Sequence, residues 1–510
     1  METRDLVQTW LRGRASLTDG GELQLASREA QPLANKFRRA YHWIAAKAIH
    51  APYRDLEFGA PFAVGSGEGK VELHREAGFC SFILLPLLNL LTSRRLLIVG
   101  APGRGKTTVA TLMALLAGSS PEEVRRSVQH GHPQLTLADL LGGPLPGVLV
   151  NAREPAEVRV AWRGWITRRV KIIDEYNRIP TKTQSALLSL MAEGYAEMYE
   201  QVVHCGPSAW FLTANDDGGG GTFPVIEALK DRIDVVVRGT PFHASGLDAM
   251  VDRVASARSP EEAVPAELVF SPEELDEADR QVRAVPVSSV VRDALGFLLG
   301  QLDFCRRASD RTEAQNKDTL HLSGRRVGHV CNEDCPLDKH VNLCAQTENG
   351  VSARAYQTLI HLAQALAYFR GRPAVGIDDL RALAPWVLLE KLRPNPHAAF
   401  FQKPENQALL TDRASWIRQL FDRSLDQHAA YGPSRRGIAE LRAEAETTDL
   451  PGLAPAKVRA RQEQVRRKIE ELLRKNEYNG PVHADLVLLK SLHDGYQNHL
   501  DRFEPAGGTR

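Results

Sequence analysis

The sequence predicts an α/β domain built on a parallel sheet, followed by two regions made of helices. Over residues 76–245, short apolar runs alternate with helical patterns, which is typical of a parallel sheet covered by helices on both faces. From about residue 266 the apolar pattern becomes helical, and Ser271, Pro272 and Glu274 form a helix start with Ser271 as the N-cap. The expected segments are a helical or irregular extension over residues 1–75, the α/β core over 76–245, an all-α domain over 246–395 and a helical extension over 396–510.

The bulk composition favours a protein without a dominant charge. Lys and Arg number 64 against 63 Asp and Glu, so no whole-chain field attracts nucleic acid or an anionic membrane. The first residues lack an apolar stretch, and the strongest apolar run, 82–91, is short, so we expect neither a signal peptide nor a membrane span. Six cysteines are too few for a disulfide scaffold, which favours a reducing, cytoplasmic location.

The expected strands cover residues 96–99, 170–173, 210–213 and 233–237. The first strand leads into a glycine-rich loop with a helical stretch, 107–116, behind it. The loop consists of Gly100, Ala101, Pro102, Gly103, Arg104, Gly105, Lys106, Thr107 and Thr108. Glycines let backbone N–H groups approach a phosphate closely, and the helix amino terminus adds partial positive charge. The pattern predicts that Lys106 reaches the β- and γ-phosphates of ATP and that Thr107 ligates Mg²⁺.

Two further strands end in polar residues. Asp174 and Glu175 follow the strand 170–173 in the form of a Walker B motif, and Asn215 follows the strand 210–213. Ligands of open α/β sheets lie at the carboxyl ends of the strands, so these residues are expected near the phosphate loop. Asp174 is then a Mg²⁺ ligand, Glu175 polarises the attacking water, and Asn215 faces the γ-phosphate or the water. A solvated acidic turn and a strand-ending Asn have the same local pattern.

These motifs resemble the AAA+ ATPases, specifically the MoxR group in the clade with an insert in helix 2. The resembling segments are residues 136–142, 174–188, 213–215, 221–224, 231–232, 270–274 and 350–355, within a region of about 95–395. Two departures are visible, because Asp216 and Asp217 follow Asn215 where the group commonly has Asn-Pro, and Tyr176 replaces an aliphatic residue.

The resemblance implies a P-loop AAA+ core with a parallel sheet, followed by an all-α lid domain. It implies that Arg232 acts as an arginine finger across a subunit boundary, and that Arg354 is the sensor 2 residue that couples the γ-phosphate to lid closure. Members of the group usually form hexameric rings, remodel protein clients, and often work with a partner that carries a von Willebrand A domain.

A polar, cysteine-containing insertion covers about residues 304–349. It holds Cys305, Cys331, Cys335 and Cys344. A segment of this size has little core of its own, and a closed tetrahedral zinc site supplies folding energy, so we expect one Zn²⁺ on these four thiolates. His329 and His340 are substitute ligands. Reduced cysteines in a loop and a redox disulfide are the alternatives.

The sequence therefore predicts a Mg²⁺-dependent ATPase that remodels a protein partner as a ring, without contact to a membrane. A nucleotide-dependent motor or loader on nucleic acid is the alternative, and it depends on basic residues between 457 and 468 that have glutamates at i,i+4 spacing. A slow nucleotide-gated scaffold is favoured only if Glu175 or Arg232 is misplaced.

Overall fold

The computed structural model describes residues 15–17, 23–25, 32–65, 67–151, 153–154, 157–215, 227–256, 259–331, 334–447, 450–474 and 478–502. The chain divides into two compact units. Unit 1 comprises Met1–Ser288 and Arg354–Lys391, and unit 2 comprises Ser289–Ala353 and Leu392–Arg510. Among the described residues, no helix is both long and apolar enough to cross a membrane.

Unit 1 is built on a five-stranded sheet in the order β13-β5-β12-β9-β6, and every neighbouring pair is parallel. The strands are β5 (Arg95–Val99), β6 (Val128–His130), β9 (Val170–Asp174), β12 (Ala209–Ala214) and β13 (Val235–Arg238). The central strand β12 is buried along its whole length, because helices cover both faces of a parallel sheet. The predicted α/β class is therefore confirmed, with β6 as an additional edge strand.

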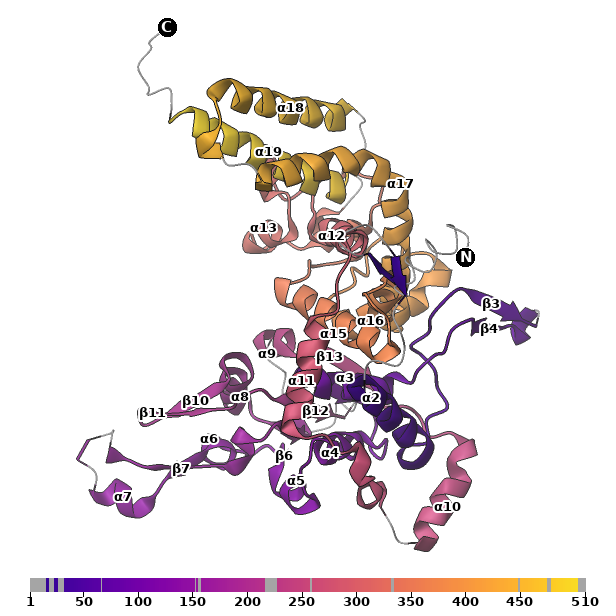
Figure 1. The fold of residues 1–510 in the computed structure, drawn as a ribbon, viewed down its shortest axis with the longest axis vertical. Coiled ribbons are helices and arrows are strands. Elements are labelled where there is room, and N and C mark those ends of the chain that lie inside the picture. The colour runs from indigo at the N-terminus through magenta and orange to yellow at the C-terminus, as the bar shows by residue number, and fades with distance from the viewer. Residues whose placement is uncertain are drawn as a thin grey trace. The chain divides into compact units, whose positions relative to one another are not determined.

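Helices surround this sheet, and Figure 1 labels them. The helices of unit 1 are α2 (Pro32–Trp43), α3 (Ser81–Thr92), α4 (Lys106–Leu116), α5 (Pro121–Ser127), α6 (Leu137–Leu141), α7 (Pro146–Asn151), α8 (Thr181–Glu193), α9 (Glu227–Arg232), α10 (Leu247–Ser256), α11 (Pro272–Arg283), α15 (Ala353–Arg370) and α16 (Ile377–Leu388). The predicted start of α11 is confirmed, since Ser271 and Glu274 form a capping box.

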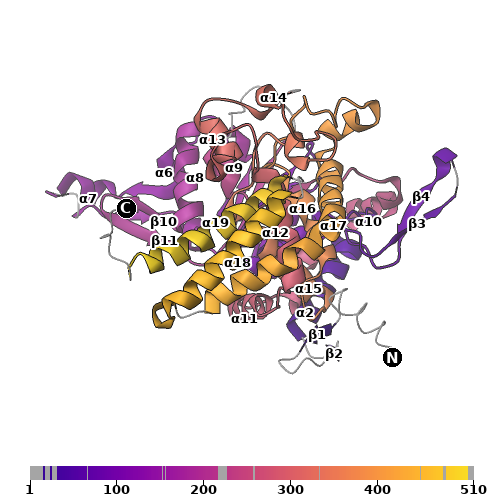
Figure 2. The same ribbon diagram turned by 90° about the horizontal axis from the view of Figure 1, so that it is seen from above.

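Among its described residues, unit 1 also contains four short antiparallel strand pairs. They are β1 (Ala15–Leu17) with β2 (Leu23–Leu25), β3 (Pro61–Val64) with β4 (Val71–His74), β7 (Gly142–Pro144) with β8 (Val160–Trp162), and β10 (Tyr195–Met198) with β11 (Gln201–His204). Figures 1 and 2 both place the β7–β8 and β10–β11 hairpins on the same side of unit 1.

Unit 2 is helical. Its helices are α12 (Ser289–Asp303), α13 (Lys317–Leu322), α14 (Val327–Val330), α17 (Arg413–Thr447), α18 (Pro455–Arg474) and α19 (Gly480–Leu500). The core of the carboxyl-terminal helices includes Val458, Val465 and Leu472 of α18, as their helical spacing predicts. The Asn479 side chain accepts a hydrogen bond from the Val482 N–H and so caps the start of α19.

Basic residues of α18 form ion pairs with glutamates of the same helix. Arg466 lies 2.7 Å from Glu463 and 2.6 Å from Glu470, and Arg467 lies 3.1 Å from Glu463. Lys468 pairs with Glu471 at 2.9 Å. The glutamates offset the positive charge of this stretch, which favours a solvated helix face over a nucleic-acid contact.

Candidate functional site

The glycine-rich loop connects β5 to α4 at the carboxyl edge of the sheet. Gly103 and Gly105 have φ angles of 75° and 71°, the left-handed region that glycine adopts at little cost. Lys106 follows as the first residue of α4, and its side chain is nearly buried. Its Nζ donates to the carbonyl oxygens of Gly100 and Ala101, at 2.6 and 3.0 Å. The Lys106 ammonium group therefore lies against the backbone of the loop that would bind phosphate.

Asp174, the last residue of β9, lies beside the start of α4. The Thr107 hydroxyl donates to Asp174 Oδ1 at 3.0 Å, and the Thr213 hydroxyl donates to the same oxygen. The Nδ1 atom of His130 lies 3.4 Å from Asp174 Oδ2. A hydroxyl and a carboxylate side by side are oxygen donors of the kind that Mg²⁺ uses together with phosphates and waters. These residues therefore fit the Mg²⁺ that the sequence motif implies.

Glu175 occupies the turn after β9, with a φ angle of 52° that is uncommon for a residue with a side chain. Its backbone N–H donates to Thr213 Oγ1 at 3.0 Å. Asn215 Nδ2 donates to Glu175 Oε1 at 2.8 Å, and the other end of the same amide accepts from Lys106 Nζ at 2.8 Å. Asn215 therefore links the two groups that the motifs assign to phosphate binding and to water activation, although their roles remain predictions.

Gly131 has no side chain, so the segment that contains it packs closely against the Walker B turn of the same chain. Its N–H donates to the Asp174 carbonyl oxygen at 2.7 Å, and a Cβ at this position would lie 2.2 Å from the carbonyl oxygen of Glu175. Backbone atoms cannot yield as a flexible side chain does, so Gly131→Ala must displace the turn that holds Glu175.

We expect Gly131→Ala to lower ATP turnover by about 100-fold, the scale of loss from a misplacement near 1 Å, while ATP binding is retained. The matched control is Gly143→Ala, because a Cβ there would meet nothing within 4 Å. Steady-state phosphate release and a nucleotide-induced melting shift measure the two properties. Unchanged turnover in Gly131→Ala would show that the position of Glu175 does not depend on this contact.

The two predicted arginines belong to segments that contact each other within unit 1. Arg232 is the last residue of α9, and Arg354 lies at the start of α15. Arg354 Nη1 forms an ion pair with Asp231 Oδ2 at 2.6 Å, and Lys391 Nζ donates to the Asp231 carbonyl oxygen at 3.2 Å. Arg354 is thus ion-paired with Asp231, the residue that directly precedes Arg232 in the sequence. The residues after Asn215, up to 226, lie outside the described residues.

Three further side chains lie at the site, although the motifs do not single them out. Thr213 touches both acidic residues, His130 lies near Asp174, and Arg178 Nη1 lies 3.5 Å from Glu175 Oε2. Only Thr213 has a usable sequence signal, since it stands two positions before Asn215 and its side chain points to the same face of the strand. The other two depend on β6 and on the turn Tyr176–Arg178.

The zinc site predicted on Cys305, Cys331, Cys335 and Cys344 is not supported. All four are free thiols, and among the described residues no group of three His, Cys, Asp or Glu side chains could hold a metal ion. Burial is the main cause that raises the pKa of the Cys331 thiol to about 11 and that of Cys344 to about 12. The insertion instead has a small apolar cluster of Leu320, Val327 and Val330.

Comparisons with known proteins agree with this geometry. A model of the ATPase family associated with various cellular activities (AAA) matches residues 95–235, and a model of the AAA lid domain matches residues 342–412. The chaperone MoxR1 of Mycobacterium tuberculosis is 27% identical over 147 residues, which are 29% of this chain and 36% of that protein. The chain therefore contains an AAA domain and an AAA lid domain, and it is similar to MoxR-type AAA+ ATPases. The region that matches the AAA model contains the phosphate loop, both acidic residues and Asn215.

Two other proteins resemble this chain over a longer stretch. YeaC of Bacillus subtilis, an uncharacterised protein, is 26% identical over 319 residues, covering 62% of this chain and 83% of YeaC. A crystal structure of a candidate ATPase from Cytophaga hutchinsonii is 17% identical with a TM-score of 0.49, and the match covers 77% of this chain and 94% of that one.

Proposed function

We propose that this chain binds ATP with Mg²⁺ and hydrolyses it to ADP and phosphate. The observation that supports the proposal most directly is the connected set of hydrogen bonds from Lys106 through Asn215 to Glu175, beside the Thr107–Asp174 pair. Phosphoryl transfer depends mainly on positioning and charge neutralisation, and this set supplies a cation, an acid and an orienting amide at one edge of the sheet.

Each of these side chains has a distinct task in the proposal. Lys106 would exchange its carbonyl acceptors for phosphate oxygens, because a charged acceptor gives the stronger hydrogen bond. Thr107 and Asp174 would hold Mg²⁺, which neutralises charge on the phosphates when bound. Glu175 would accept a proton from the attacking water, and Asn215 would fix the orientation of Glu175.

We also propose that the chain works in the cytoplasm as a ring, with a hexamer as the expected size, that remodels a protein client. One relative is named a chaperone, and the family resemblance implies a ring in which Arg232 completes the neighbouring ATP site. A partner with a von Willebrand A domain is part of the same proposal. The Arg354–Asp231 ion pair supports a coupling between the helix that carries sensor 2 and the segment that carries the finger.

The finger proposal predicts a specific result in mixtures. Arg232→Ala should bind ATP normally but lose turnover by roughly 10³-fold or more, the scale reported for arginine fingers. Adding Glu175→Gln subunits should restore part of the activity, because a mixed interface then pairs an intact Glu175 with an intact Arg232. Phosphate release across a series of mixing ratios, together with light scattering in ATP, measures both expectations.

The control variant is Arg442→Ala, since Arg442 is an exposed residue of α17 that pairs only locally with Glu446. It should leave turnover unchanged. Absence of recovery at every mixing ratio, or a monomer in saturating ATP, would contradict the action of Arg232 across an interface.

A further inference from the structure

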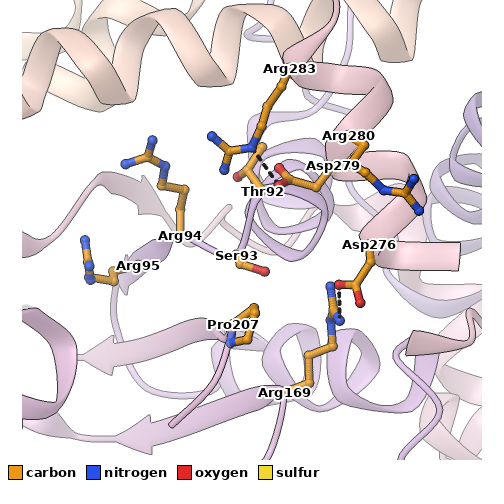
Figure 3. Close-up of a pocket in the computed structure, with 10 residues that line it drawn as sticks. All are labelled: Thr92, Ser93, Arg94, Arg95, Arg169, Pro207, Asp276, Asp279, Arg280 and Arg283. Atoms are coloured by element: carbon orange, nitrogen blue, oxygen red, sulfur yellow. Dashed lines mark hydrogen bonds and ion pairs between the residues drawn. The ribbon is translucent and has the colours of Figure 1, made fainter. Parts of the chain in front are cut away.

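A charged cavity lies in unit 1, at the amino edge of the sheet. It has a volume of about 410 Å³ and is lined by Thr92, Ser93, Arg94, Arg95, Arg169, Pro207, Asp276, Asp279, Arg280 and Arg283. Figure 3 shows Arg94 and Arg95 on one side of the opening and the charged residues of α11 on the other. Arg95 begins β5 and Gly100 directly follows it, so at about 3.3 Å per residue the cavity is roughly 16 Å from the phosphate loop.

Local structure explains why so many guanidinium groups meet here. Arg94 and Arg95 stand at the start of β5, and Arg169 directly precedes β9, so the parallel strands bring all three to one edge. Asp276, Asp279, Arg280 and Arg283 recur at helical spacing along α11, which places them on one face of that helix. The cavity therefore combines one sheet edge with one helix face.

The lining has more positive than negative charge. Five arginines against two aspartates give it a formal charge of +3. Two neighbouring carboxylates take up part of this surplus, since Asp234 pairs with Arg94 and Arg95 at 3.6 and 3.1 Å, and Glu277 pairs with Arg280 at 2.8 Å. One positive charge remains after both are counted. A bound anion would therefore reduce repulsion among the arginines.

Ion pairs and hydrogen bonds hold several of these groups in place. Nδ1 of His361 accepts from Arg94 at 3.1 Å and Nε2 donates to Asp279 Oδ1 at 3.1 Å, which assigns a neutral His361 protonated on Nε2. Asp279 in turn pairs with Arg283 at 2.8 Å. Burial is the main cause that lowers the pKa of His361, in agreement with the neutral form. Preorganised donors lose little entropy when they bind a ligand.

One buried donor of Arg169 lacks a hydrogen-bond acceptor among the described residues. Its Nη1 pairs with Asp276 at 2.7 Å, but its Nε is buried and has no hydrogen-bond partner in the described structure. A buried donor without an acceptor costs free energy, so such groups are uncommon unless a ligand or water completes them.

We infer that this cavity is a second anion site, which binds a small polyanion bearing two or more phosphate groups. Guanidinium groups match phosphate oxygens in paired geometry, and several guanidinium groups around one cavity suit a ligand with several such groups. A monocarboxylate would merely repeat what Asp276 and Asp279 already provide. The volume is in the range of small-molecule sites.

The test uses inorganic triphosphate and calorimetric titration of the full chain in a Lys106→Ala background, which removes phosphate binding at the loop. We expect one remaining site, and we expect the double variant Arg280→Gln with Arg283→Gln to weaken it at least tenfold. Both side chains are substantially exposed, and neither takes part in the hydrogen bonds that join Arg94, His361 and Asp279 to one another. Arg442→Gln, which removes an equally exposed charge elsewhere, should leave affinity unchanged.

A second measurement keeps the inference testable if the Lys106→Ala chain fails to fold. In the unmodified chain, triphosphate should occupy a second site besides the phosphate loop, with affinity that falls as NaCl rises, and the Arg280→Gln with Arg283→Gln substitutions should weaken that site alone. Absence of that site, or equal affinity in the Arg280→Gln with Arg283→Gln chain, would overturn the inference. Binding of polyglutamate in place of triphosphate would also overturn it, because the occupant would then be an acidic peptide.

Discussion

Lys106→Ala is expected to abolish ATP binding. In the structure, Lys106 Nζ contacts Gly100, Ala101 and Asn215 at 2.6, 3.0 and 2.8 Å, so its charge is held at the back of the loop. Alanine removes the loop's cation and cannot offset the charge of the β- and γ-phosphates. In the unmodified protein, ATP at 100 times its Kd adds about 2.7 kcal/mol to the free energy of unfolding. The variant should show no such gain in a thermal melt.

The control for this prediction is Lys70→Ala, because Lys70 is exposed in the loop between β3 and β4 and lies outside the site. It should keep the full melting shift. The ligand-free melting temperatures of both variants separate a loss of binding from a loss of folding. An undiminished shift in Lys106→Ala, in a folded protein, would contradict the assignment of residues 100–108 as a phosphate loop.

The residues that meet at the carboxyl edge of the sheet could be predicted from the sequence, because each of them stands where a strand ends. In a parallel sheet all strands end at one edge, so Asp174 at the end of β9 and Asn215 just after β12 must lie near the loop that follows β5. The strands themselves are apolar runs without alternation, which is the pattern of strands buried on both faces. No long-range information is needed for this step.

The division of the helical regions could not be predicted in the same way. We expected one helical domain over residues 246–395, whereas the two compact units assign α15 and α16 to the sheet and α12 to the carboxyl-terminal helices. Contacts far apart in sequence decide this, such as the hydrogen bond from the Thr358 hydroxyl to Asp234 at 2.6 Å. Helical periodicity shows which face is apolar but does not show which partner covers it.

The cysteines and the arginine cavity both show that spacing along the chain does not determine which side chains meet in space. Four cysteines in a polar insertion indicate zinc by composition, but ligand geometry depends on how the loop folds. Conversely, Arg94, Arg169 and Arg283 have no shared motif, because they are brought together only by strand order and by the position of α11. Spacing along the chain therefore detects sites carried by one segment and misses sites assembled from several.

Glu175→Gln is expected to retain ATP and Mg²⁺ binding while turnover falls by about 10²- to 10⁴-fold, the usual contribution of a general base. The substitution preserves size, and the glutamine oxygen can still accept the hydrogen bond that Asn215 Nδ2 donates at 2.8 Å. It removes the negative charge that Arg178 faces at 3.5 Å and the group that would accept a proton from water. The melting shift with ATP should be unchanged while phosphate release falls by this factor.

The comparison variant is Glu197→Gln on β10, an exposed residue of the same type outside the site, which should hydrolyse ATP at the normal rate. Glu175→Gln should also accumulate the ATP-bound assembly, since nucleotide enters but is not consumed, and light scattering in ATP would detect it. Turnover in Glu175→Gln within a few-fold of the unmodified protein would mean that another group activates the water. His130, with its Nδ1 3.4 Å from Asp174, would then be the first residue to substitute, because it lies at the same edge of the sheet.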